Sequence, residues 1–483
     1  MMVVKKHRIH TKRNALLFVG VAAIVALVII IVGIVTGRKS TVHITGSNLA
    51  YYIDDEQYTF NEEPYICDNT VYLPAEDILS VYGYTCKYNA DKEEFTATKE
   101  DDTAYIYVNK NTVKYGKDTH TYEGLPSMRR GGVVYIPSQM MSAFTKDEFV
   151  FDGEFKFVER PYRDLMENVC IDNSHRIKGD VSKYNGVYVV GDKAAMELLY
   201  YPKDNCVNYA NVINSLADAL PSVQVYNVVV PTMTEFYGPE ELYTDQIKGI
   251  RTIYENLNEN VMPVNVIKEM WPHADEHLYF ATDHHWTQRG AYYAYRAFIH
   301  AKGEEIADLS EFSQDNVENF IGSWEYSLKG TPGESVLTEN AETMERFMPI
   351  VEYTGDVFLD MNLTDRWRES KVIVESDEKY TTFIGGDMPI IRYKTNVKNG
   401  EKAVIIKESF GNAFATWAVN NYEEVYIIDP RQWNGFGGAS DRGEFNLVTF
   451  YNDVCQFDDL IVVSYPGSAT SNMRKAISSL VGM

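Results

Sequence analysis

The sequence predicts an α/β fold for the larger, C-terminal part of the chain, in which helices flank a parallel β-sheet. Short apolar runs recur along residues 161–483, and the stretches between them have helical periodicity. Residues 41–160 carry shorter strand patterns and turns, which indicate a small α+β domain. We therefore expect a basic tail at 1–14, a transmembrane helix at 15–36, and two domains at 41–160 and 161–483.

The N-terminal segment has the pattern of a membrane anchor. An apolar run without a charged residue extends from Ala15 to Val35, and a helix of about 20 such residues crosses a bilayer. Only basic charges precede it, at Lys5, Lys6, Arg8, Lys12 and Arg13. A cleaved signal peptide is the alternative, but the next residues, Thr36-Gly37-Arg38-Lys39, lack a small-x-small cleavage site. The positive-inside rule then predicts a single-pass protein of the cytoplasmic membrane, with a cytoplasmic N-terminus and its bulk outside.

The net charge and the cysteine content argue against certain classes of partner and of metal site. The formal net charge is −24, which argues against a nucleic acid partner, because its phosphates would be repelled. The five cysteines include no CxxC pair, which argues against a thiolate zinc site. Cys67–Cys86 and Cys170–Cys206 are pairings that an oxidising compartment would allow, and buried free thiols are the alternative.

The small domain contains an internal repeat. Val71-Tyr72-Leu73-Pro74-Ala75 is echoed by Val134-Tyr135-Ile136-Pro137-Ser138, and each is followed by a short amphipathic segment and a strand. Tyr105 to Val108 reads as a strand before a turn at Asn109. This duplicated unit resembles the copper amine oxidase N-terminal-like domain of bacterial surface proteins. The resemblance implies a spacer or wall-binding role.

In the large domain, buried strands are expected at residues 187–190, 223–230, 403–406, 425–428 and 460–463. The functional groups of such sheets lie beyond the carboxyl ends of the strands. Gly191-Asp192, Pro231, Glu408-Ser409 and Ser464-Tyr465-Pro466 would all lie there.

Ser409 is the candidate nucleophile. It follows the strand at Ala403 to Ile406 and precedes an expected helix from Phe410 to Asn420, so it lies at a strand-to-helix turn. The backbone N–H groups of Ser409 and Gly411 could bind an oxyanion there. The alternative is a plain N-cap serine, whose hydroxyl bonds the first N–H groups of the helix.

Asp283 and His285 are the candidate orienter and base. Thr287 is expected to cap a helix that continues through Ala301 and stops at Gly303. In an extended segment before that cap, residues two apart share a side, so the carboxylate can orient the imidazole. Trp286 would pack as a wall under the site.

A metal site is the alternative for this region. Imidazoles and carboxylates suit zinc or manganese; six of them lie close together in sequence, at His273, Asp275, His277, Asp283, His284 and His285. Their spacing matches no helical pair such as HExxH. We therefore expect neither a metal nor another cofactor.

Two stretches resemble the bacterial DHHW family. The first runs from Tyr279 to Thr287 through Asp283-His284-His285-Trp286 and is followed by Gly290-Ala291-Tyr292. The second joins Ile405 to Phe414 with Ile428-Asp429-Pro430-Arg431. That family is similar to the SGNH-like domains of alginate and peptidoglycan O-acetylation proteins, in which an Asp-x-His-Trp motif precedes the serine.

The resemblance implies roles for individual residues. Asp283, His285 and Ser409 match the triad, and Gly411, Asn412 and Glu408 would support it or the oxyanion. The residues expected to bind substrate are His284, Trp286, Arg431 and Asp192, of which Asp192 matches a strand-end Gly-Asp of the family. The relatives usually have Asp before the serine, so the longer Glu408 is a departure that could weaken the site.

Together these features predict an SGNH-like enzyme anchored in the membrane. It would transfer an acetyl group through acyl-Ser409 to a cell-envelope or secreted polysaccharide. A membrane acyltransferase is the donor partner that the resemblance implies. The same triad would serve a carbohydrate esterase, and a non-catalytic polysaccharide-binding subunit is the alternative from another class.

Overall fold

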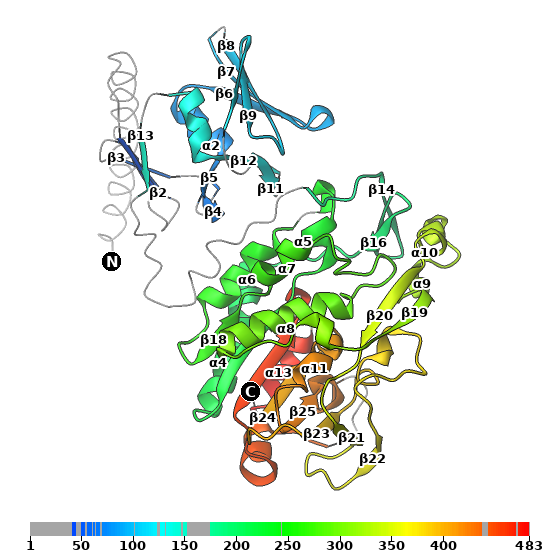
Figure 1. Cartoon of the computed structure of the whole chain (residues 1–483). Helices are drawn as coiled ribbons and strands as arrows, with labels where there is room; N and C mark the ends of the chain where they lie inside the picture. Colours follow the sequence, from blue (N-terminus) through cyan, green and yellow to red (C-terminus); the bar gives the residue numbers. More distant parts are fainter. Residues whose placement is uncertain are drawn as a thin grey trace, which may run out of the picture. The chain divides into compact units, whose positions relative to one another are not determined.

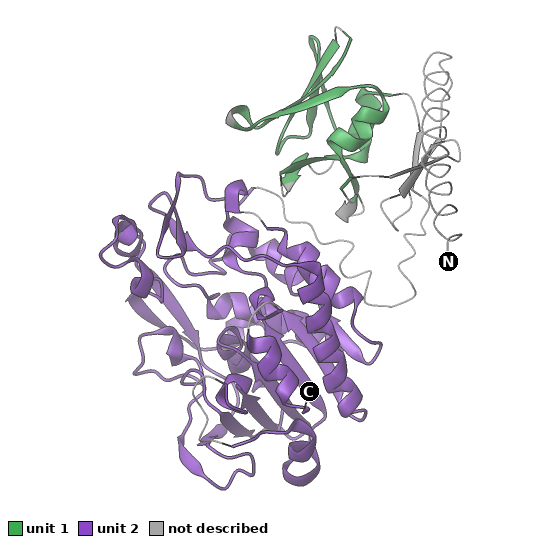
Figure 2. Cartoon of the chain, turned by 180° about the vertical axis from the view of Figure 1, so that it is seen from behind, with its two compact units in different colours: residues 1–160 green, residues 161–483 purple. Residues whose placement is uncertain are grey.

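The computed structural model describes residues 41–151 and 174–482, apart from short gaps at 45–49, 54–55, 60, 63, 68–69, 101, 123–125, 131, 146–147, 243, 437–442 and 470–471. The chain divides into two compact units, residues 1–160 and 161–483 (Figure 2). The basic tail and transmembrane helix expected from the sequence lie outside the described residues. Within the described part, no helix is long and apolar enough to cross a membrane.

The described residues of the first unit form three small sheets. The first has the order β13-β1-β2-β3 (Glu148–Phe151, Thr41–Ile44, Ala50–Ile53, Glu56–Thr59). The second has the order β10-β9-β8-β7-β6 (Asp118–Thr121, Thr112–Tyr115, Asp102–Tyr107, Glu94–Lys99, Thr85–Asn89). The third has the order β11-β12-β5-β4 (Met128–Arg130, Val133–Pro137, Thr70–Pro74, Tyr65–Cys67).

Both copies of the sequence repeat adopt the same local structure. Strand β5 leads directly into helix α2 (Ala75–Val81), and β12 leads into a 3₁₀ helix at Ser138–Ala143. The two strands pair antiparallel, with Ile136 opposite Leu73. Their inward side chains pack with α2 in one buried cluster that forms the core of this unit.

The second unit is built on an eight-stranded sheet with the order β18-β17-β26-β24-β25-β23-β21-β22 (Figure 1). The first five strands are parallel: β18 (Val261–Val264), β17 (Gln224–Val229), β26 (Asp459–Ser464), β24 (Lys402–Lys407) and β25 (Glu424–Ile428). The last three run antiparallel to their neighbours: β23 (Ile390–Thr395), β21 (Tyr353–Phe358) and β22 (Arg366–Glu369). The expectation of a parallel sheet therefore holds for the first five strands but not for β23, β21 and β22; β21 and β22 follow each other through a short loop, which can join only antiparallel neighbours.

Helices cover both faces of this sheet, as expected. Adjacent residues of a strand point to opposite faces. Tyr226 of β17 packs edge-on against Phe298 of α8 (Gln288–Lys302). Its neighbour Asn227 instead hydrogen-bonds Tyr209 of α4 (Lys203–Ala219). Helix α11 (Phe410–Ala418) packs with α8, whereas α6 (Gln246–Glu255) and α13 (Asn472–Ser479) pack with α4.

The strand at Val187–Val190 does not belong to the large sheet, which corrects the expectation. It is β15, the middle strand of a three-stranded antiparallel sheet with β14 (Val181–Tyr184) and β16 (Ala194–Met196). Asn185 and Gly186 between β14 and β15 both have positive φ, as a tight hairpin turn requires. Gly191-Asp192 therefore lies in a turn of this small sheet and not at the carboxyl edge of the large one.

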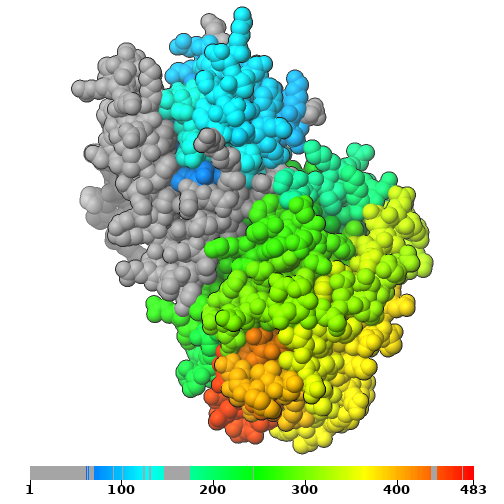
Figure 3. Space-filling model, in the orientation of Figure 1, coloured from blue at the N-terminus to red at the C-terminus, as the bar shows by residue number. Residues whose placement is uncertain are grey.

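One further antiparallel pair, β19 (Gln314–Phe320) and β20 (Glu342–Phe347), brings distant segments beside α8. Figure 3 shows the green, yellow, orange and red parts of this unit side by side on one face. The core is rich in large aromatic side chains, including the fully buried Trp286, Trp417 and Trp433. Cys86, Cys206 and Cys455 are free thiols, so neither disulfide considered from the sequence forms.

Candidate active site

Ser409 lies where the sequence predicts it, between β24 and α11, as the N-cap residue of that helix. Its hydroxyl does not cap the helix. Instead the Oε2 atom of Glu408 accepts a hydrogen bond from the Phe410 N–H at 2.9 Å. The same Oε2 atom lies 3.4 Å from Ser409 Oγ, a long contact, and the Ser409 hydroxyl has a second, closer partner.

That partner is His285. The Nε2 atom of His285 lies 2.8 Å from Ser409 Oγ, and its Nδ1 atom lies 2.6 Å from Asp283 Oδ1. Asp283 and His285 are both almost fully buried. The structure therefore brings the three predicted residues together in series, carboxylate to imidazole to hydroxyl, which is the arrangement of a serine triad.

A turn, and not the extended segment that we expected, places Asp283 beside His285. The Oδ1 atom of Asp283 also accepts the backbone N–H of His285 at 2.9 Å, so the chain turns around the carboxylate. Thr287 then caps α8 by accepting the Gly290 N–H, and Gly303 ends it with a φ of 80°. Although burial opposes ionisation, the charge and hydrogen bond of His285 hold the pKa of Asp283 well below its usual range.

Three residues that sequence reasoning missed hold this turn in place. The Ser323 N–H donates to the other oxygen of Asp283, Oδ2, at 2.6 Å. Gly322 leaves room for it, since a Cβ at that position would lie only 2.3 Å from the Asp283 Cβ. Glu342 accepts the N–H groups of Ala281 and Thr282 at 2.8 and 3.0 Å.

The imidazole of His285 lies between two other rings. The Tyr380 ring stacks on one face, with centroids 3.8 Å apart and an interplanar angle of 3°. His284 lies 3.7 Å away by ring centroids. Tyr380 is buried, whereas His284 is partly exposed in a pocket.

Trp286 does not line the pocket, which corrects its assignment as a substrate-binding residue. Its side chain is fully buried. The indole N–H donates to the carbonyl oxygen of Phe410 at 2.9 Å. Trp286 thus links the segment that carries the base to the helix that follows the nucleophile.

Glu408 directly precedes Ser409 and is almost fully buried. Its side chain reaches two backbone donors, the Phe410 N–H through Oε2 and the Tyr465 N–H through Oε1 at 3.1 Å. Burial raises the pKa of this carboxyl group. The residue therefore shapes the turn at Ser409 and ties it to the end of β26.

Gly411 and Asn412 have their N–H groups committed elsewhere. The Gly411 N–H donates to the Glu408 carbonyl oxygen at 2.9 Å. The Asn412 side chain donates to Asp387 Oδ1 at 3.1 Å, and its backbone N–H donates to the Ser409 carbonyl oxygen. The backbone N–H groups of both residues are therefore engaged within the turn and are not available to an oxyanion.

An ion network of two buried and two partly exposed residues lies next to the turn. Lys407, which is fully buried, donates to Asp387 at 2.7 Å. Arg431 donates to Asp387 and, through two nitrogens, to Asp429. Burial opposes the charge on Arg431, but the bonds to Asp429 and the nearby acids raise its pKa. Arg431 is thus held at the pocket in one orientation.

The pocket itself has a volume of about 380 Å³ and is lined by His284, Glu408, Ser409, Phe410, Arg431, Tyr465 and the first turn of α13. Asp192 is not among its lining residues. Its side chain accepts a hydrogen bond from Ser335 Oγ at 3.1 Å, on the exposed turn after β15. The structure therefore separates Asp192 from the other expected substrate-binding residues.

Asp283, His284 and His285 could also offer a metal ion one ligand atom each, all within 4.8 Å of one another. Two of the possible ligand atoms are already hydrogen-bonded. Asp283 Oδ1 bonds His285, and His284 Nδ1 bonds Ser323 Oγ at 2.6 Å. The other members of the metal alternative form separate pairs, such as His273 with Glu276 and His277 with Glu342. A metal would have to displace the bonds that join the triad.

Comparison with known proteins identifies both units. The DHHW protein family matches residues 164–428, and the copper amine oxidase N-terminal domain matches residues 52–158. No curated protein sequence matches the chain.

Three solved structures are similar to the second unit. A DHHW family protein from Eubacterium siraeum is 27% identical, with a TM-score of 0.56 over 63% of this chain and 99% of that one. Bacillus cereus PatB1 is 18% identical, with a TM-score of 0.47 over 61% of this chain and 98% of that one. The O-acetyltransferase domain of Pseudomonas putida AlgJ is 10% identical, with a TM-score of 0.33 over 62% and 99%. The chain belongs to the DHHW protein family.

Proposed function

We propose that this protein is a serine-dependent acyltransferase that acetylates a polysaccharide outside the cytoplasmic membrane. Ser409 is the nucleophile, His285 the general base and acid, and Asp283 the residue that orients the imidazole. The observation that carries the proposal is the unbroken series of contacts from Asp283 through His285 to Ser409, at 2.6 and 2.8 Å.

The surroundings of Ser409 favour a nucleophile over a structural serine. A capping serine would bond the helix N–H groups, but Glu408 takes that role at Phe410. The hydroxyl lines a pocket instead. The low pKa of Asp283 keeps its carboxylate ionised, so that it stabilises the imidazolium formed when His285 takes the serine proton.

The reaction has two balanced halves. In the first, Ser409 Oγ attacks the carbonyl carbon of the acyl donor, His285 takes its proton, and the donor's leaving group departs with that proton. In the second, an acceptor hydroxyl attacks acyl-Ser409, its proton passes through His285 to Ser409 Oγ, and the acylated acceptor leaves. The backbone N–H of Ser409, at the start of α11, is the donor that we assign to the developing oxyanion.

The proposed substrate class and cellular location rest on sequence features and not on the geometry of the site. The motif resemblance supports a glycan acceptor, an acetyl group and a membrane acyltransferase as donor partner. The apolar run from Ala15 to Val35, preceded by the basic tail at 1–14, supports a single-pass anchor at residues 15–36 with domains 41–160 and 161–483 outside the membrane. An esterase would differ only in using water as the acceptor.

Rapid-mixing kinetics with p-nitrophenyl acetate test the proposal on the full chain in detergent. We expect a burst of p-nitrophenol, equal to the amount of active protein, before slower turnover. Ser409→Ala and His285→Ala should abolish the burst, and Ser310→Ala, a matched change of an exposed serine outside the pocket, should retain it. A burst that survives in folded Ser409→Ala would disprove the proposed nucleophile.

A further inference from the structure

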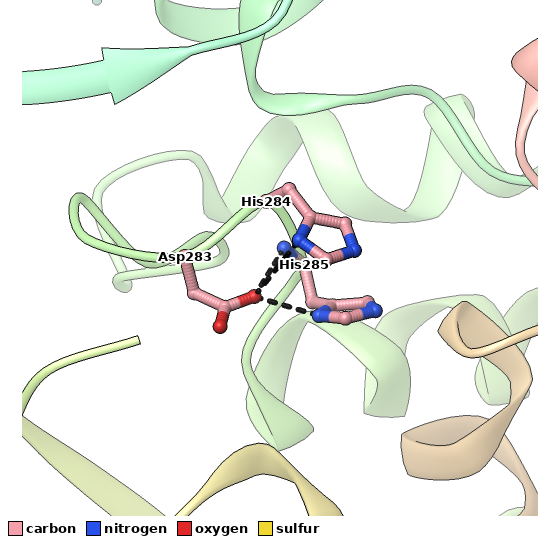
Figure 4. A group of neighbouring side chains, drawn as sticks. All are labelled: Asp283, His284 and His285. Atoms are coloured by element: carbon pink, nitrogen blue, oxygen red, sulfur yellow. Dashed lines mark hydrogen bonds and ion pairs between the residues drawn. The ribbon is translucent and has the colours of Figure 1, made fainter. Parts of the chain in front are cut away.

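His284 lies against the base on the pocket side. The centroids of the two imidazoles are 3.7 Å apart, at an interplanar angle of 38°. Figure 4 shows the rings one above the other, with the nitrogen remote from Asp283 pointing the same way in both. Because this nitrogen of His285 meets Ser409 at 2.8 Å, Nε2 of His284 points to the same end of the pocket, which both His284 and Ser409 line.

Ser323 is the hydrogen-bond partner of Nδ1 of His284. The backbone N–H of His284 donates to Ser323 Oγ at 3.4 Å, and the same Oγ lies 2.6 Å from His284 Nδ1. We assign the Ser323 hydroxyl as the donor to Nδ1, an assignment under which a neutral His284 carries its proton on Nε2. Asp283 Oδ1 is 3.7 Å from Nδ1, which is too far for a hydrogen bond.

The ring is also kept neutral. Burial, and next the charge of His285, lower the pKa of His284 to about 4. Among the residues that the structure describes, none hydrogen-bonds Nε2 of His284. The pocket therefore presents one fixed N–H donor beside the nitrogen of His285 that handles the proton.

We propose that His284 binds the acceptor, its Nε2–H donating to an oxygen of the sugar next to the hydroxyl that attacks acyl-Ser409. This rests on the proposed function and adds a residue that selects sugar over water. The attacking hydroxyl of the sugar must come close to His285 to give up its proton. The Nε2–H group of His284, whose ring lies against that of His285, is therefore close to the bound sugar. His284 keeps its own proton throughout, while the attacking hydroxyl passes its proton to His285 and then to Ser409 Oγ.

The test compares two esters that give the same acetyl-enzyme. In methyl 6-O-acetyl-α-D-glucopyranoside the leaving group is a sugar, which by microscopic reversibility occupies the acceptor position. In p-nitrophenyl acetate it is not a sugar. kcat/KM is measured with both esters on the full chain in detergent, for the wild type, His284→Asn and His284→Gln.

We expect His284→Asn to lower kcat/KM for the sugar ester about tenfold more than for p-nitrophenyl acetate, as the loss of one hydrogen bond predicts. His284→Gln should restore most of the difference, because its amide nitrogen reaches the place of Nε2. Ser323→Ala, which frees the tautomer but keeps the backbone N–H to Asp283, should lie between them.

Equal losses for the two esters, no loss, or no reaction of the wild type with the sugar ester despite a burst with p-nitrophenyl acetate would each overturn this role of His284. The absence of any burst in the wild type would instead count against the proposed function as a whole, so the two failures are distinguishable.

Discussion

Replacing Gly322 by Ala is expected to disable the triad without removing any of its members. The new Cβ would lie 2.3 Å from the Asp283 Cβ and 2.5 Å from its Oδ2. Carbon atoms pack at about 3.5–4.0 Å, so Asp283 and the Gly322 backbone must separate by about 1 Å. The Ser323 N–H, which holds Asp283 Oδ2 at 2.6 Å, would move with this backbone.

A misplacement of about 1 Å costs about 10²-fold in rate, which corresponds to about 2.7 kcal/mol in the activation free energy. The assay is the rate constant of the p-nitrophenol burst, normalised to the folded fraction measured by circular dichroism. Gly355→Ala is the matched control, because its Cβ would lie 2.3 Å from the carbonyl oxygen of Ser370, in strand β21, which contributes no residue to the pocket.

We expect both variants to lose thermal stability and only Gly322→Ala to lose burst rate per folded molecule. A Gly322→Ala protein that acylates at the wild-type rate would refute the reasoning that Gly322 and Ser323 fix the carboxylate.

Three further predictions concern the support of the site. Glu342→Gln should lower the free energy of unfolding by about 2–4 kcal/mol in chemical denaturation, because an amide cannot accept every bond that the carboxylate takes from Ala281 and Thr282; an unchanged midpoint would contradict this. Trp286→Phe removes the bond to the Phe410 carbonyl and should cost about 1–3 kcal/mol, with slower acylation; a rate equal to that of the wild type would show that this link is dispensable. The folded-state pKa of His284, about 4, lies below its ordinary 6.5, so its contribution to stability is fully present above pH 6.5 and is lost as the pH falls toward 4. With the side chain 32% exposed, the loss should be about 1–2 kcal/mol, and His284→Gln should not show this component in unfolding titrations from pH 7 to 4.

The sequence was most informative where one residue determines the local backbone. Thr287 and Gly303 marked the ends of α8, and both have the capping geometry that their residue types predict. The strand–serine–helix order placed Ser409 correctly, because a buried apolar run followed by a helical pattern leaves only the turn between them.

Residues that support the site from distant segments could not be predicted. Gly322 and Ser323 follow β19, Glu342 begins β20, and Asp387 precedes β23; nothing in a single sequence links them to Asp283 or Arg431. The Asn185-Gly186 pair, in contrast, did carry a hairpin signal that would have separated β15 from the large sheet. The antiparallel strand β22 contains charged residues such as Arg366 and Arg368, so it lacks the apolar run by which a buried strand is predicted from sequence.

Peptide mass spectrometry after brief exposure of the full chain to an acetyl ester would detect the acyl-enzyme itself. We expect one added acetyl group on the peptide that contains Ser409, and none on that peptide in His285→Ala. A folded wild-type protein that turns over the ester while Ser409 remains unmodified, or an equal adduct in His285→Ala, would contradict this expectation.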